Sequence, residues 1–161
     1  MVDIEGMVPV RDLSQTGFDD ALDLMELASD AERFLLHHTG CRHLEAIYFD
    51  RGFKAVAVFY AITEVQINLE NNFWIVVGDM PPMCFVGSRY ENGAKVLLEY
   101  SVQWLRWAEA ARTNAITDGM AVPRTAGTFE VLKPTSKLIE AIEIRANFIK
   151  DKVVPTWPED L

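Results

Sequence analysis

The chain has 161 residues, half of which are hydrophobic, and a formal net charge of −9 at pH 7. This length and composition predict a single folded domain and exclude a disordered chain. The acidic balance argues against nucleic acid and anionic membranes as direct partners, because both attract clustered Lys and Arg, and it favours a basic protein.

The N-terminal sequence MVDIEGMVPV is acidic where a signal peptide would be basic, and no apolar run approaches the roughly 20 residues of a membrane span. We therefore expect a cytoplasmic protein. The chain has two cysteines, Cys41 and Cys84. In a reducing compartment we expect both to be free thiols.

The N-terminal 40 residues predict an arm followed by a helix. Residues 1–13 hold few periodic signals, so we expect a loose N-terminal arm on the single 1–161 domain. A helix is predicted to begin near Thr16, with Phe18, Leu22 and Met25 at helical spacing, and to end at Gly40. The pair Ser29 and Glu32 repeats the capping-box pattern, which leaves open a break in this helix.

The middle of the chain predicts an antiparallel β-meander of four or five strands. The segment FWIVVG, residues 73–78, is uncharged and is typical of a strand buried on both faces. Other strands are predicted at 44–50, 53–62, 64–70 and 83–86, with a turn at Asp50-Arg51-Gly52. Because the connections are short, neighbouring strands should run antiparallel.

The last third of the chain predicts two helices. One begins near Asn92 and carries Tyr100, Trp104 and Trp107 on one stripe. Residues 114–134 are rich in Gly and Pro and predict an irregular crossover, and a final helix begins near Thr135. The predicted fold class is α+β, with an antiparallel sheet packed by an N-terminal helix, a Trp-rich middle helix and a C-terminal helix.

Four acidic residues share one face of the first predicted helix. Asp19, Asp23, Glu26 and Asp30 stand at i, i+4, i+7 and i+11. Like charges at this spacing repel one another by a few tenths of a kcal/mol per pair. The stripe is either an ordinary solvated face or a surface that docks a basic partner.

Asp79 is the leading candidate for a small-molecule site. It follows the buried strand, and the aromatic stripe of Trp104 and Trp107 could supply the wall of a pocket. Glu70, Tyr90 or His43 could provide a second polar group, but no second group sits at a recognisable catalytic spacing. An Asx-type role for Asp79 in the turn before Pro81 is therefore the favoured interpretation. For the aromatic stripe, the favoured interpretation is the protein core, and a pocket wall or dimer contact is the alternative.

Motifs for metals and cofactors are not found in the sequence. His37, His38, Cys41 and His43 do not have the spacing of a zinc site, and no second Cys/His pair follows. There is no phosphate-binding glycine loop and no nucleophile elbow. We expect no metal, no cofactor and no catalytic constellation.

Three segments together carry a resemblance. FWIVVGDMPP, EYSVQWLRWAEA and AIEIRANFIKDKVVPTW resemble a family of small uncharacterised bacterial proteins with a W-x-V-x-G-D-x-P-P-like strand end, over about Phe73 to Trp157. The resemblance implies a bacterial, cytosolic origin and a turn at Gly78–Pro81 that shapes the fold. It implies no activity for any residue.

The sequence therefore supports two functional hypotheses. The first is a non-enzymatic protein-binding module, such as an immunity or antitoxin protein that masks a basic partner through the acidic stripe. The alternative is a small-ligand-binding protein or hydrolase-like enzyme with its site near Asp79. Either is compatible with a homodimer, for which Trp157 and the tail that follows it could provide the contact.

Overall fold

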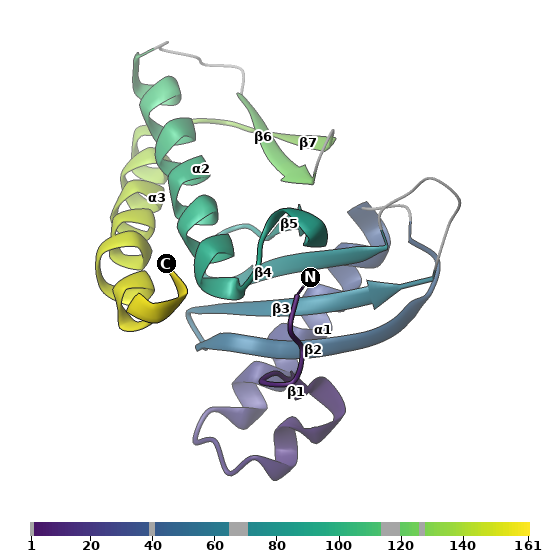
Figure 1. Cartoon of the computed structure of the whole chain (residues 1–161). Helices are drawn as coiled ribbons and strands as arrows, with labels where there is room; N and C mark the ends of the chain where they lie inside the picture. The colour runs from purple at the N-terminus through teal and green to yellow at the C-terminus, as the bar shows by residue number, and fades with distance from the viewer. Residues whose placement is uncertain (1, 39–40, 65–70, 114–119, 126–127) are drawn as a thin grey trace.

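The protein is an α+β fold in which helices cover both faces of one antiparallel sheet (Figure 1). The computed structural model describes residues 2–38, 41–64, 71–113, 120–125 and 128–161. Between residues 120 and 132 it describes the backbone only. The helices are α1 (Ala21–His38), α2 (Gly93–Thr113) and α3 (Ser136–Phe148). The strands are β1 (Val8–Pro9), β2 (Leu44–Phe53), β3 (Val56–Thr63), β4 (Asn72–Gly78), β5 (Met83–Val86), β6 (Met120–Thr125) and β7 (Thr128–Leu132).

The main sheet has the strand order β1-β2-β3-β4-β5, and every neighbouring pair is antiparallel. This confirms the predicted meander and the buried strand at 73–78. Strand β3 lies at the centre, so its alternate side chains serve two cores. Ala57, Phe59 and Ala61 pack under α1, and Val58 and Tyr60 pack under α2 and α3.

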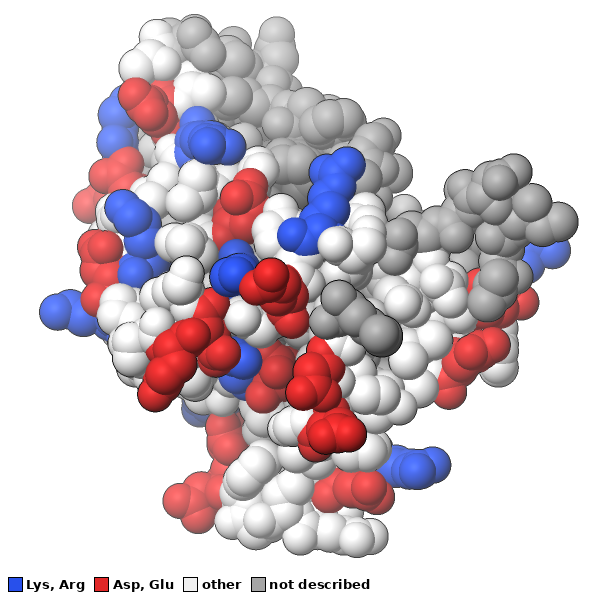
Figure 2. Space-filling model, viewed as in Figure 1, with Lys and Arg blue, Asp and Glu red and all other residues white. Residues whose placement is uncertain are grey.

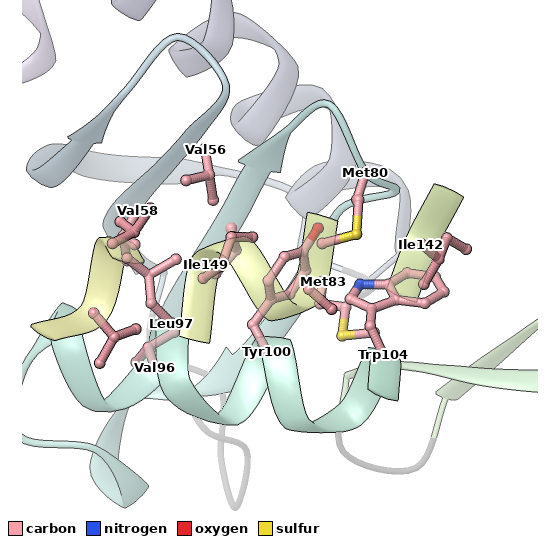
Figure 3. Close-up of a cluster of buried hydrophobic side chains, with 14 of the residues drawn as sticks. Val56, Val58, Met80, Met83, Val96, Leu97, Tyr100, Trp104, Ile142 and Ile149 are labelled. Carbon is pink, nitrogen blue, oxygen red and sulfur yellow. The ribbon is translucent and has the colours of Figure 1, made fainter. Parts of the chain in front are cut away.

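The core between the sheet and the helices α2 and α3 is shown in Figure 3. Tyr100 and Trp104 point from α2 toward the sheet, and Trp107 is buried as well. The Tyr100 hydroxyl donates a hydrogen bond of 2.9 Å to the Pro81 carbonyl, which ties α2 to the turn between β4 and β5. The predicted aromatic stripe is therefore confirmed as part of the core.

Gly78 has a backbone role at the end of β4. Its φ is +156°, and a Cβ built there would lie 2.1 Å from the Ala55 carbonyl oxygen. The next residue, Asp79, donates its backbone N–H to the same oxygen at 2.9 Å. Glycine thus allows β4 to end in close contact with the turn between β2 and β3.

The N-terminal region differs from the prediction in two respects. Residues 1–13 are not a loose arm, because β1 pairs with β2, while Met7 and Leu13 are buried. Helix α1 begins at Ala21 and passes through Ser29 without a break. The capping-box pattern at Ser29 does not interrupt it because buried residues continue on one face: Leu24, Ala28, Ala31 and Leu35.

Two further predictions are corrected. Asp50, Arg51 and Gly52 belong to β2, and the turn lies at residues 54–55 instead. The segment expected to be an irregular crossover contains the β6–β7 hairpin, which lies against β5 (Figure 1). The strand predicted at 64–70 falls almost entirely outside the described residues. Within the described part of the chain, no helix combines the length and the apolar composition that crossing a bilayer requires.

Candidate functional site

The predicted acidic residues lie on α1 and on the turn that leads into it, outside the buried face of the helix. Asp19, Asp23 and Glu26 are exposed, and their carboxylates form no hydrogen bond or ion pair among the described residues. Asp30 is half-buried and forms an ion pair with Arg33, one turn along the helix. Three of the four predicted carboxylates are therefore available to a partner.

Apolar side chains border these carboxylates on the outer side of α1. Leu22 is 81% exposed, and Phe18, Met25 and Leu36 are each between 36% and 43% exposed. They are half of the eight large hydrophobic side chains that the described residues leave exposed. Phe18, in the turn before α1, also packs edge to face against Phe49 of β2, with ring centroids 6.2 Å apart, so it is not part of this outer side. We call Asp19, Leu22, Asp23, Met25 and Glu26 the α1 surface.

The acidic residues of this surface are predictable from the sequence, whereas its apolar component was not predicted. The spacing of Phe18, Leu22 and Met25 predicts a helix but does not show which of its sides is buried. The side of α1 that packs on the sheet carries its buried residues: Leu24, Ala28, Ala31, Phe34 and Leu35. The sequence does contain a second apolar stripe, because Leu24, Ala28, Ala31 and Leu35 also follow helical spacing. If that stripe is buried, Leu22 lies on the opposite side of the helix.

Asp79 is exposed in the turn after β4. It lines a cavity of about 30 Å³ together with Tyr100, Arg145 and Phe148, which has room for roughly one or two water molecules. Trp104 and Trp107 are not among the described residues that line this cavity. They are buried in the core, packed edge to face with ring centroids 5.7 Å apart.

The second polar groups proposed for Asp79 lie elsewhere. His43 accepts a hydrogen bond from Glu64, just beyond the end of β3, whereas Asp79 contacts Ala55 at its beginning. The Tyr90 carbonyl accepts a bond from Trp74 near the start of β4. Both are therefore at the opposite end of the sheet from Asp79, and Glu70 lies outside the described residues.

A larger groove of about 760 Å³ opens between the C-terminal half of α1 and the end of β4. Its walls include His37, His38, Arg33 and Pro82. The two imidazole rings lie edge to face at 4.9 Å, and His38 also lies against Phe34. The described residues contain no group of three or more His, Cys, Asp or Glu side chains placed to hold a metal ion.

An unpredicted polar network joins β2, the start of α2 and the C-terminal residues. The Asp50 carboxylate accepts hydrogen bonds from the Gly93 N–H at 3.1 Å and from Arg51 Nε at 2.5 Å. Arg51 also bonds Asp160 at 2.8 Å and lies 5.1 Å above the Trp157 ring. Sequence reasoning missed this network because its members are far apart in the chain.

Burial alone would lower the pKa of the Arg51 guanidinium, because it disfavours the charged form. The hydrogen bonds to Asp50 and Asp160 outweigh this effect, so the pKa is raised. Figure 2 shows acidic and basic side chains gathered on the face where both chain ends lie. The network pairs its charges internally, so we interpret it as a structural tie between three elements.

Comparison of the chain with models of known families, with curated proteins and with solved structures finds no match.

Proposed function

We propose that the protein is a non-enzymatic binding module that masks a basic partner protein through the α1 surface, as an immunity or antitoxin protein does. The observation that carries this proposal is the combination of free carboxylates and outward apolar side chains on one helix. Asp19, Asp23 and Glu26 flank Leu22, which is 81% exposed.

This combination matches the usual composition of a protein interface. Interfaces bury an apolar centre and surround it with polar groups, and complementary charges speed the encounter of the partners. Leu22 and Met25 would form the centre, and the three carboxylates would face Lys or Arg side chains. A solvated face that served only solubility would gain nothing from an exposed leucine at its middle.

A charge-reversal experiment tests the proposal. The triple variant Asp19→Lys, Asp23→Lys, Glu26→Lys is compared with Glu109→Lys, Glu140→Lys, Asp151→Lys, which changes the net charge equally at exposed positions on the other side of the sheet. Each protein is used to capture partners from a host lysate, with elution in salt steps and identification by mass spectrometry. Circular dichroism confirms that both variants fold.

We expect the wild type and the control variant to capture the same basic protein and the α1 variant to lose it. With that protein purified, the association rate constant should fall about 10-fold or more in the α1 variant and should decrease with salt in the wild type. Equal capture by both variants would contradict the assignment of the α1 surface.

A further inference from the structure

Strand β2 is paired along only part of one edge. On the inner side it pairs with β3 from Leu44 to Phe53. On the outer side β1 contributes two residues, opposite Phe49 and Tyr48, and the chain then turns away at Val10. No described strand pairs with Leu44–Ile47 on this side, so the edge presents backbone groups that a further strand could pair with.

A groove of about 420 Å³ follows this edge. It is lined by every residue of β2 from Leu44 to Tyr48. Since successive side chains of a strand point to opposite faces, a groove lined by consecutive residues runs along the edge and not over one face. Its other wall consists of Pro9, Val10, Arg11 and Glu32.

The groove combines apolar and charged lining residues in a way that suits a short extended peptide. Val10, Leu44 and Ile47 are partly buried against the core under α1 and give it an apolar floor. Glu32 and Glu45 are exposed at its rim, and Arg11 is the one cationic side chain among the described residues that line it. The unpaired segment of four residues is about 13 Å long at the usual strand rise.

A second copy of this chain does not suit the edge. The register with β3 shifts between Leu44 and Ala46, which marks a bulge at Glu45. A bulge and a charged side chain are two devices that prevent edge-to-edge pairing of identical strands. In an antiparallel pair centred on this segment, Glu45 of each copy would lie close to Glu45 of the other.

We propose that the Leu44–Ile47 edge of β2 binds an extended segment of a partner protein, which adds to the sheet as a short strand. Its alternate apolar side chains contact Leu44 and Ile47, and Lys or Arg side chains contact Glu32 and Glu45. This site is separate from the α1 surface, and the inference does not depend on the function proposed above.

A peptide selection tests the inference on the intact protein. A displayed library of random seven-residue peptides is selected on the wild type, and the most enriched sequence is synthesised with a fluorescent label. We expect apolar residues alternating with Lys or Arg. Binding measured by anisotropy should weaken about 10-fold or more in Glu32→Lys, Glu45→Lys, and not in the control Glu109→Lys, Glu140→Lys.

Backbone pairing is tested with two methylated forms of the same peptide. Each carries N-methyl groups on alternate amides, in one form on odd and in the other on even positions. Because only alternate amides of an added strand face the sheet, one form should lose binding and the other should keep it. Hydrogen exchange at residues 44–47 should slow in the complex.

Failure to enrich any peptide would overturn the inference, as would equal binding of both methylated forms. Loss of peptide binding in the Asp19→Lys, Asp23→Lys, Glu26→Lys variant alone would place the peptide on the α1 surface and would also overturn it. Conversely, the peptide site stands if that variant loses only its protein partner, so the two proposals fail separately.

Discussion

At the scale of single residues, Gly93 and Asp50 are in close contact across two elements. The Gly93 N–H, at the start of α2, donates to the Asp50 carboxylate, which thereby caps the helix from a strand 43 residues away in the chain. A Cβ at Gly93 would lie 2.1 Å from Asp50 Oδ2 and 3.2 Å from Val58. The carboxylate would have to move from a position that Arg51 also holds.

We therefore predict that Gly93→Ala destabilises the fold by about 1–3 kcal/mol through this overlap, although alanine is normally the better helix residue. The free energy of unfolding is measured by urea denaturation. Gly6→Ala is the matched control because nothing lies within 4 Å of a Cβ at that position. Equal stability of both variants would show that Asp50 relaxes freely.

The same residues show where sequence reasoning stops. Asp50-Arg51-Gly52 has turn chemistry, and the pattern therefore predicted a turn. In the structure the Asp50 carboxylate binds the first N–H of α2, and Arg51 binds Asp50 and Asp160. Partners that lie 43 and 109 residues away leave no local signal, so neither the strand nor the network could be read from this segment.

At the scale of elements, α1 carries two apolar stripes with different environments. Leu24 is 1% exposed and packs on the sheet, whereas Leu22 is 81% exposed. Both stripes have helical spacing, so periodicity predicted the helix but could not decide which stripe is buried. Packing on the sheet determines which stripe is buried, because the small side chains Ala28 and Ala31 allow that side of α1 to approach the sheet closely.

This pair of leucines gives a matched prediction within one helix. Leu24→Ala should lower the free energy of unfolding by about 2–5 kcal/mol, because it leaves a cavity in the core. Leu22→Ala should change it by less than about 0.5 kcal/mol, since the side chain is already in water. Urea denaturation measures both, and a large loss in Leu22→Ala would mean that this side of α1 is covered within the chain.

Other elements were predictable for identifiable reasons. Strand β4 was predicted because an uncharged run of β-branched and aromatic residues suits a strand buried on both faces. Helix α3 was predicted because Thr135 caps it, accepting a hydrogen bond from the Leu138 N–H. The β6–β7 hairpin was missed because Pro123 lies within β6, where proline normally argues against a strand.

At the scale of the whole molecule, two cores share one sheet. Phe59 faces the core under α1, and its neighbours Val58 and Tyr60 face the core under α2 and α3. The backbone of β3 and β4 is therefore common to both layers. Loss of either core would expose one face of strands that the other core needs in place, and this coupling favours a single cooperative transition.

The tryptophans provide a natural test of that coupling. All four, Trp74, Trp104, Trp107 and Trp157, belong to or pack against the core under α2 and α3. Their fluorescence therefore reports on one layer only. We predict that Leu24→Ala, a change in the other layer, shifts the urea midpoint of tryptophan fluorescence as far as it shifts the midpoint of far-UV circular dichroism, because two-state unfolding gives all probes one midpoint. If fluorescence kept its wild-type midpoint while helical signal was lost earlier, α1 would unfold on its own, and the shared sheet would not couple the two cores.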